Sequence, residues 1–334
     1  MSLELYEKYR DIDGYIDLNK AEKDGLFNAS SLRTELRGSD RSIGLSEENA
    51  SSALKGWFDF STSDSVQKET FLVRTNMFRG DEQNYGDYAE LIFEEYATQL
   101  GIRTPHYDLF KYNNEKGVLS QKLTMPSETM ISLGENLASN KIEGVPINFV
   151  DNIITQTLRA QGKSTDEIEE LKRNLREITL LDISALNEDR HLGNICMILD
   201  SETEEMSLGI YDNEISFLLA NPINKFYSKE DVEIYANLSS SIIHGNRTED
   251  PVETAKEILK SGDSDLLFFL EDAISTDILQ IMKTVENRIK TKLPVKLKNI
   301  VNVAFKSRAA ELGKVFKKTY NKIYQNDNIG GEDR

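Results

Sequence analysis

Three side chains in the middle of the sequence have the types and spacing that phosphoryl transfer needs. Asp189 and Asn194 are five residues apart, and Asp212 follows 23 residues after Asp189. Phosphoryl transfer needs a carboxylate near the attacking hydroxyl, and oxygen ligands that hold magnesium against the nucleotide phosphates. The pattern therefore predicts that Asp189 acts on the hydroxyl and that Asn194 and Asp212 bind the metal ion.

The chain between Asn194 and Asp212 must fold back if these side chains are to meet. Apolar residues at 195–199 and 206–211 flank the polar segment 200–205, which is typical of a β-hairpin. Such a hairpin would return Asp212 to the side of Asn194. Asn, Asp and Gly are also common in plain loops, but the hairpin and a long helix before the loop favour a functional site.

That long helix is expected over 165–187. Thr165 is its expected N-cap, acidic residues fill its first turn, and apolar residues recur along one face. The apolar face consists of Ile168, Leu171, Leu175, Ile178 and Leu181. The helix would deliver the chain directly to the loop that carries Asp189.

A small sheet is expected earlier in the chain. Segments 56–61 and 69–75 are rich in aromatic or β-branched residues and are predicted to be antiparallel strands. A helix is expected over 87–102, with Gly101 as its stop, and two further strands within 103–123. These elements would form a sheet that carries one helix.

The motifs resemble those of a known kinase family. The segments Asn187-Glu-Asp-Arg-His-Leu-Gly-Asn194 and Ile210-Tyr-Asp-Asn213 are similar to a motif pair of the HipA-like serine/threonine kinases, including the shorter CtkA-like members. The helix that opens with Ala89-Glu90-Leu91 and ends before Pro105 is similar to another family segment. By that match Glu90 takes the position of the glutamate in the kinase helix αC. The type II phosphatidylinositol 4-kinases share a related motif pair and are the nearest competitor.

This resemblance implies an α+β, two-lobed, protein-kinase-like fold, with ATP and Mg²⁺ bound between the lobes. We expect the small β-rich N-lobe at residues 49–125. The mostly helical C-lobe is expected at 126–325, where helical periodicity dominates. Residues 1–48 match no motif and are treated as an N-terminal extension of unknown role. Residues 326–334 are predicted to be a disordered tail.

The resemblance also assigns roles to the residues of the central loop. Asp189 would be the catalytic base, or would orient the substrate hydroxyl, while Asn194 and Asp212 would bind Mg²⁺. Arg190 and His191 belong to the same segment and either contact phosphate or brace the loop. The orientation of three neighbours stays open: Glu188, Asn213 and Glu214.

One position on the strand before the helix departs from the kinase pattern. The strand reads Phe71-Leu-Val-Arg74, so Arg74 stands where protein kinases have a phosphate-binding Lys. Arginine is always protonated, and its forked guanidinium could pair with both the nucleotide phosphates and Glu90. The alternative is that Arg74 is a surface residue without a role.

The expected phosphate loop is a second departure, because it is not rich in glycine. It reads Asn49-Ala-Ser-Ser-Ala-Leu-Lys55. Backbone N–H groups of small residues can hold phosphate without glycine, so Ser51, Ser52 and Lys55 are candidate nucleotide-binding residues. The stretch is equally consistent with a plain polar loop. Because some family members are regulated by phosphorylation here, Ser51 or Ser52 is also a candidate phosphorylation site.

The adenine-binding hinge is expected to follow the strand at 117–121. Hinge hydrogen bonds come from the backbone, so side chains carry little information about them. The candidate residues are Gln121, Lys122 and Leu123.

Composition limits the classes of function. The 334 residues include 40 Lys and Arg against 57 Asp and Glu, giving a net charge of −17. This charge argues against a general nucleic-acid or membrane-surface binder. The single cysteine, Cys196, excludes internal disulfides and a Cys-rich zinc site. No apolar run is long enough to span a membrane, and we expect a cytoplasmic protein.

Taken together, these features predict an ATP- and Mg²⁺-dependent phosphotransferase that acts on Ser or Thr of a protein substrate. Two alternatives stay open. One is a lipid or small-molecule kinase of related fold, and the other is a pseudokinase or toxin-like module that works by binding a partner. The resemblance also implies a toxin–antitoxin context, with an antitoxin-like regulator as a candidate partner.

Overall fold

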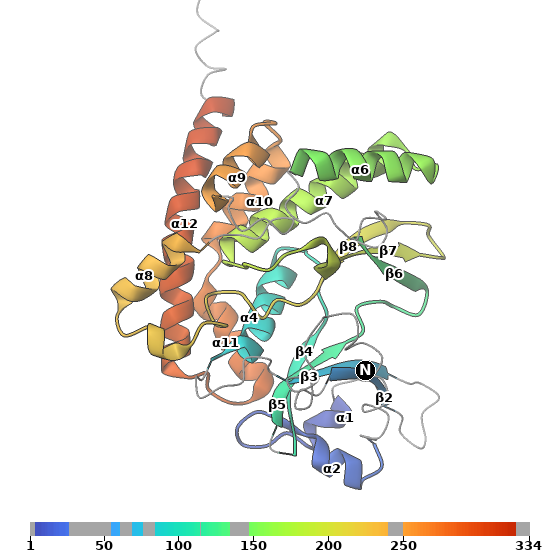
Figure 1. The fold of residues 1–334 in the computed structure, drawn as a ribbon, viewed down its shortest axis with the longest axis vertical. Coiled ribbons are helices and arrows are strands. Elements are labelled where there is room, and N and C mark those ends of the chain that lie inside the picture. The colour runs from blue at the N-terminus through green and yellow to red at the C-terminus, as the bar shows by residue number, and fades with distance from the viewer. Residues whose placement is uncertain are drawn as a thin grey trace, which may run out of the picture.

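A computed structural model describes residues 4–26, 55–60, 69–75, 84–113, 115–133, 147–239 and 250–324. Figure 1 shows a small sheet at one end of the molecule and a large group of helices at the other. Helix α4 lies between the two parts, and the long helix α12 runs along one side of the helical part. This is the two-lobed α+β arrangement predicted from the sequence.

The small sheet has five strands in the order β1-β4-β5-β3-β2. Every neighbouring pair is antiparallel except β1 and β4, which are parallel. The four strands predicted from the sequence are therefore confirmed. The strand bounds are β1 (Ile16–Asp17), β2 (Lys55–Phe60), β3 (Glu69–Thr75), β4 (Tyr107–Tyr112) and β5 (Glu115–Gln121).

The N-terminal residues, which matched no motif, contribute to this sheet. Helices α1 (Glu4–Glu7) and α2 (Leu18–Lys23) flank strand β1, which pairs with β4. Arg10 fixes the segment, because its guanidinium donates to both carboxylate oxygens of Asp108 at 2.9 and 2.6 Å. Both side chains are buried, so this ion pair links the segment to β4 from inside the fold.

Helix α4 (Gly86–Gln99) joins the sheet to the helical part. It contacts β4 and β5 on one side and α11 on the other, and most of its residues are buried. The helix ends at Leu100, and Gly101 adopts φ +75°, a conformation that favours glycine. The predicted stop at Gly101 is thus confirmed.

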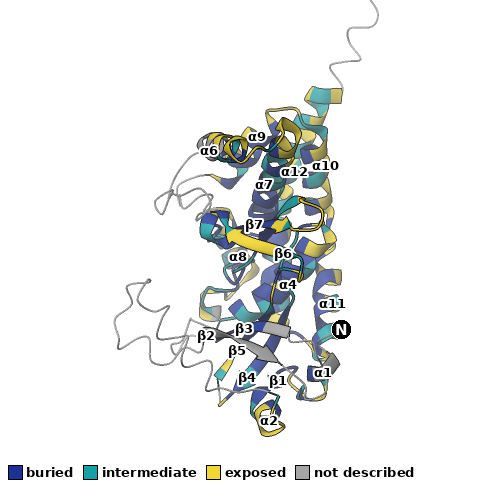
Figure 2. Ribbon diagram, turned by 90° about the vertical axis from the view of Figure 1, so that its right-hand side faces the viewer, coloured by how far each residue is buried: buried dark blue, intermediate teal, exposed yellow. Residues whose placement is uncertain are grey.

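A second sheet of three antiparallel strands lies in the C-terminal part, in the order β6-β7-β8. Strands β7 (Ile195–Asp200) and β8 (Met206–Ile210) form the predicted hairpin. Strand β6 (Glu128–Ser132) has no counterpart in the sequence-based prediction. It is an edge strand whose residues are mostly exposed (Figure 2), so it lacks the apolar alternation that marks a strand.

The helices of the larger part are α6 (Ile147–Ala160), α7 (Thr165–Ser184), α8 (Lys229–Leu238), α9 (Pro251–Leu259), α10 (Ser264–Ser275), α11 (Ile278–Ile289) and α12 (Val295–Tyr324). Helix α7 is buried along the predicted apolar face and contacts α6, α9, α10 and α12. No helix in the described ranges is long and apolar enough to cross a membrane.

Two details of α7 differ from the prediction. The helix ends at Ser184 rather than at residue 187, because Leu186 adopts φ +52°. The N-cap is Ser164 rather than Thr165, since the Ser164 side chain accepts from the backbone N–H of Glu167. The Glu167 side chain in turn accepts from the backbone N–H of Ser164, which completes a capping box. Ser and Thr are both good N-caps, and the glutamate three positions after Ser164 favours the serine.

Candidate active site

The loop after α7 is held by a buried ion pair. Arg190 donates through Nε to Asp182 Oδ2 at 3.0 Å, and both side chains are almost fully buried. Asn187 Nδ2 donates to Asp182 Oδ1 at 2.8 Å, and Asn187 Oδ1 accepts from the backbone N–H of Asp189 at 3.1 Å. Asp182, in the last turn of α7, therefore fixes the backbone that carries Asp189.

Arg190 also reaches across to the segment after β8. Its guanidinium donates to the carbonyl of Tyr211 at 2.7 Å, to the carbonyl of Asn194 at 3.2 Å and to Asn213 Oδ1. Burial raises the pKa of the Asp182 carboxyl, and the neighbouring guanidinium opposes that shift. These contacts are those of a brace between two loops, one of the two roles that the sequence left open for Arg190.

The β7–β8 hairpin brings the predicted metal ligands together. The backbone N–H of Tyr211 donates to the carbonyl of Asn194 at 3.1 Å, so Asp212 is one residue beyond a direct contact with Asn194. Asn194 Nδ2 donates to the carbonyl of Asp189 at 3.2 Å. The three side chains predicted from spacing thus belong to one cluster of loops. Asp212 adopts φ +63°, which a short polar residue tolerates better than most.

Arg74 connects this cluster to the small sheet. Its Nη2 donates to Glu90 Oε1 at 2.5 Å and its Nη1 to Asp212 Oδ1 at 2.5 Å. Nη2 also lies 3.3 Å from Glu214 Oε2. Arg74 is only 7% exposed, so the alternative of a surface arginine is wrong. One guanidinium from β3 thus meets carboxylates from α4 and from the segment after β8.

Three carboxylates lie around the Arg74 guanidinium, one from α4 and two from the segment after β8. Burial raises the pKa of Glu90 to about 8; Arg74 opposes this shift, while Asp212 and Glu214 add to it. The backbone N–H of Asn213 donates to Glu90 Oε2 at 2.9 Å. Glu90 is thus held between the Arg74 guanidinium and one backbone N–H, next to two other carboxylates.

The sequence left the orientation of Asn213 and Glu214 open and missed Tyr107 and Asp182. Asn213 is fully buried and Glu214 is 6% exposed, so both side chains turn inward. The Tyr107 hydroxyl accepts from the backbone N–H of Asp212 at 3.3 Å and lies 3.4 Å from Asn213 Nδ2. Asn213 and Glu214 were candidates because they directly follow Asp212. Tyr107 and Asp182 offered no signal, because one lies in an ordinary strand and the other in a helix.

The remaining candidates lie at the edges of the site. Ser51 and Ser52 fall outside the described residues. The backbone of Lys55 is paired with that of Arg74 in the β2–β3 ladder. His191 is exposed, and its ring lies over Gly193, where an added Cβ would come within 2.9 Å of it.

The predicted hinge residues follow β5, where the chain passes from the first sheet to the second. The backbone N–H of Gln121 donates to the carbonyl of His106 at 2.8 Å, and Lys122 is exposed. Leu123 is buried in a cluster with Cys196 and Ile198, where it packs against the second sheet. These residues lie in the connection between β5 and β6, and their role as a hinge stays a prediction.

The residues present fit a magnesium ion. Asn194 and Asp212 offer amide and carboxylate oxygens, which are the donors that Mg²⁺ prefers. Asn194 uses its Nδ2 for the loop carbonyl, so its Oδ1 is the atom suited to a cation. Within the described ranges there is no group of three or more His, Cys, Asp or Glu placed to hold a metal. Mg²⁺ bound with nucleotide commonly uses one or two protein ligands and completes its shell with phosphates and water.

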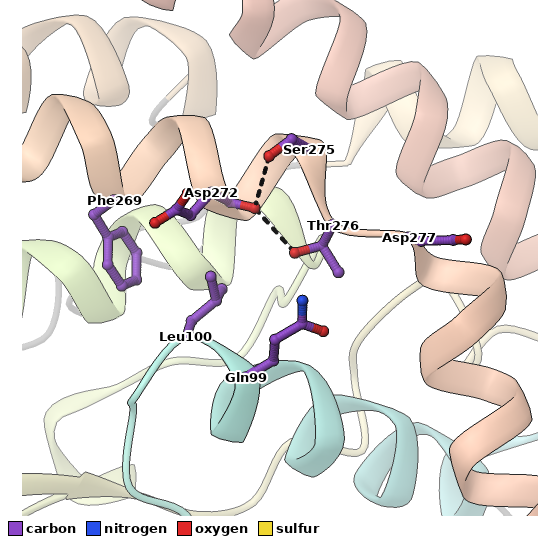
Figure 3. Close-up of a pocket in the computed structure, with 7 residues that line it drawn as sticks. All are labelled: Gln99, Leu100, Phe269, Asp272, Ser275, Thr276 and Asp277. Atoms are coloured by element: carbon purple, nitrogen blue, oxygen red, sulfur yellow. Dashed lines mark hydrogen bonds between the residues drawn. The ribbon is translucent and has the colours of Figure 1, made fainter.

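A separate surface pocket lies away from this cluster, between the end of α4 and the connection from α10 to α11 (Figure 3). The hydroxyls of Ser275 and Thr276 both donate to the backbone carbonyl of Asp272, at 3.3 and 2.9 Å. These polar groups cap the end of α10. The pocket includes none of the residues that the sequence singled out.

Comparison with known proteins gives structural neighbours but no sequence match. No family model and no curated protein matches the chain. The fold is similar to the crystal structure of the Helicobacter pylori proinflammatory kinase CtkA, with a TM-score of 0.60 and 14% identity over 80% of this chain and 92% of that one. HipA, from a Shewanella oneidensis complex of HipA, HipB and operator DNA, aligns with a TM-score of 0.49 and 12% identity over 81% of this chain and 66% of that one. The similarity to CtkA confirms that the chain has the kinase-like fold expected from its resemblance to the HipA-like kinases.

Proposed function

We propose that the chain is an ATP- and Mg²⁺-dependent kinase of the HipA-like family that transfers the γ-phosphoryl group to a Ser or Thr hydroxyl of a protein. The observation that carries this proposal is the ion-pair cluster of Arg74 with Glu90 and Asp212. In protein kinases a Lys on the third strand pairs with the αC glutamate and with phosphates, and a later Asp binds Mg²⁺. Here β3, α4 and the segment after β8 supply those groups.

The other residues of the site have complementary roles in this proposal. Asp189 accepts the proton of the substrate hydroxyl or orients that hydroxyl, and Asn194 and Asp212 provide oxygen ligands. When bound, Mg²⁺ would neutralise the charge of the phosphates. Arg74 presents a fixed positive charge to the same phosphates, which lowers the barrier because the charge is in place before the reaction begins. Arg190 would hold Asp189 and Asp212 in fixed positions relative to each other, because it contacts both of the loops that carry them.

Nucleotide binding is assigned to three further segments. The backbone at Gln121, Lys122 and Leu123 would hold adenine, since the hinge lies between the two sheets. Ser51, Ser52 and Lys55 would hold phosphate, with Lys55 next to Arg74 in the ladder. His191, exposed beside Gly193, would contact nucleotide from the central loop. These assignments depend on the resemblance and on position in the chain.

The test is transfer of label from γ-labelled ATP with Mg²⁺ to the chain itself, to a protein mixture and to phosphoinositide vesicles. We expect label on protein Ser or Thr, and no label when Asp189→Asn or Asp212→Asn replaces the wild type. The matched control is Glu205→Gln, which changes one charge at an exposed position in the β7–β8 turn. Label on lipid alone would favour the lipid-kinase alternative, and nucleotide binding without transfer would favour a pseudokinase.

The proposal includes a regulatory partner. An antitoxin-like protein is implied by the sequence resemblance to the HipA-like kinases. Purification of the chain together with the products of its flanking genes would test it. A stable complex is the expected result, and its absence would remove the toxin–antitoxin context without affecting the kinase activity.

A further inference from the structure

Two departures from the usual kinase pattern meet in this structure. The first is Arg74, which stands in place of the β3 lysine. The second is Glu214, since the segment Asp212-Asn213-Glu214 occupies the place of Asp-Phe-Gly, whose third residue is glycine. The two residues are 140 positions apart in sequence, yet Arg74 Nη2 lies 3.3 Å from Glu214 Oε2. A larger cation and an extra carboxylate thus occur in contact.

The chemistry of arginine explains why an extra carboxylate fits here. Lysine presents one compact charge, whereas the guanidinium presents several donors in a rigid planar fork. Glu90 contacts Arg74 through one carboxylate oxygen, Oε1. Its other oxygen, Oε2, accepts from the backbone N–H of Asn213. The side chains of Arg74 and Glu214 are each 8% exposed, and buried charges need a partner. Glu214 supplies the second partner for Nη2.

The carboxylates at the two ends of the Arg74 guanidinium differ in exposure. Glu90 and Glu214, at Nη2, are 0% and 8% exposed, whereas Asp212, at Nη1, is 33% exposed. The Nη2 end therefore contacts two buried carboxylates, and the Nη1 end contacts the more exposed one. A phosphate that meets the guanidinium beside Asp212 would reach its Nη1 end.

We propose that Glu214 is a positioning residue, which together with Glu90 fixes the Nη2 end of Arg74 so that Nη1 is presented to Asp212 and to the phosphates of the nucleotide. This inference rests on the proposed function for the identity of the ligand. Arg74 and Glu214 then form a matched pair, in which replacing either residue alone weakens nucleotide binding. The pair replaces the lysine and glycine found at these two positions in other kinases.

The experiment is a double-mutant cycle read by nucleotide binding as well as by turnover. The variants are Arg74→Lys, Glu214→Gly and the double variant, with Glu205→Gln as the control for loss of one carboxylate. The dissociation constant for ADP with Mg²⁺ is measured by thermal-shift titration, and KM for ATP and kcat by label transfer. Glu214→Asp, which keeps the charge, tests rescue if Glu214→Gly folds poorly.

We expect each single variant to weaken ADP binding by roughly tenfold or more, which is the scale of one lost charge-assisted contact. The double variant should bind at least about tenfold better than the product of the single effects predicts. Glu214→Gly should raise KM for ATP more than it lowers kcat, and Glu205→Gln should change neither. Glu214→Asp should recover part of the binding.

Two results would overturn the inference. One is a double variant whose loss equals the product of the single losses. The other is a Glu214→Gly variant that lowers the melting temperature but binds ADP as the wild type does, which would mean a purely structural role. If the wild type binds ADP with Mg²⁺ but transfers no phosphoryl group, the kinase proposal fails. The binding cycle still tests the pairing of Arg74 and Glu214 in that case.

Discussion

Two buried arginines meet carboxylates near the candidate site, and they do so in opposite ways. Arg190 pairs with one carboxylate, that of Asp182. Its other N–H groups donate to two backbone carbonyls and to the side-chain amide oxygen of Asn213. Arg74 faces three carboxylates, one of which is a third exposed. The donors of Arg190 are saturated and both members of its ion pair are buried, whereas the Arg74 cluster includes a carboxylate, Asp212, that is partly exposed. A saturated, buried cluster stabilises a fold, and a carboxylate that reaches the surface is suited to binding a cation.

The difference also separates stability from activity. Removing a partner from the Arg190 cluster leaves a buried ion uncompensated, which is among the costly kinds of substitution. Removing a carboxylate from the Arg74 cluster relieves repulsion among like charges. Loss of one partner in the Arg190 cluster should therefore destabilise the protein, and loss of one carboxylate in the Arg74 cluster should inactivate it.

The largest effect is expected for Asp212→Asn, measured as phosphoryl transfer. Loss of the carboxylate removes a proposed metal ligand, and the rate should fall by about a thousandfold, the scale of a lost transition-state contact. The free energy of unfolding, measured with urea in the absence of metal, should not decrease. Activity within tenfold of wild type would contradict the role proposed for Asp212. A large loss of stability would contradict the difference proposed between the Arg74 and Arg190 clusters.

Arg190→Leu, in contrast to Asp212→Asn, should lose much of its stability. Asp182 is 1% exposed and would be left without its counter-ion, at a cost of about 3–5 kcal/mol in the free energy of unfolding. Urea denaturation measures this directly. Asp182→Asn/Arg190→Leu should recover part of the loss, because the uncompensated carboxylate is gone. If Arg190→Leu unfolds at the wild-type urea concentration, the brace is not what holds this loop.

The elements of the site were predictable where their signals are local. The hairpin at 195–210 and the helix, predicted over 165–187 and observed over 165–184, follow from apolar periodicity and turn residues. The meeting of Asn194 and Asp212 could therefore be deduced. The burial of Arg74 could not be deduced, because it depends on α4 packing between two parts of the chain. A positively charged residue in a short strand is consistent with either face of a sheet.

Other features failed for equally specific reasons. Strand β6 carries mostly exposed residues, so it has no apolar pattern to detect. Strand β1 has two residues and pairs in parallel with a distant strand, and no local signal marks such a contact. The inward orientation of Glu214 reflects the charge on Arg74, which lies far away in sequence. Local patterns thus predict elements, and pairs of distant charges decide how the site is completed.

A change of pH should reveal the protonation of Glu90 in the Arg74 cluster when the wild type is compared with Glu90→Gln. The pKa of Glu90 is raised from 4.5 to about 8, mainly by burial, so the folded protein retains a proton that the unfolded chain releases. The stability contributed by this group is present below about pH 4.5 and is lost as the pH rises through about 8. In metal-free buffer, wild-type stability should fall between these limits, and Glu90→Gln should fall less. Equal slopes for the two proteins would mean that Glu90 is not protonated in the folded state.

The smallest effect concerns the far end of α7, the helix that carries Asp182. Ser164→Ala removes the side chain that caps the helix and should cost about 1 kcal/mol in the free energy of unfolding. Thr165→Ala is the matched control, because Thr165 is exposed and lies inside the helix rather than at its cap. Both variants should keep wild-type turnover, since the Arg190 cluster is fixed by contacts at the opposite end of α7. If Ser164→Ala lowers turnover as much as it lowers stability, the position of Asp189 depends on the whole length of α7. The Arg190 cluster would then pass the loss of the N-cap on to the active-site loop, instead of keeping the loop independent of that end of α7.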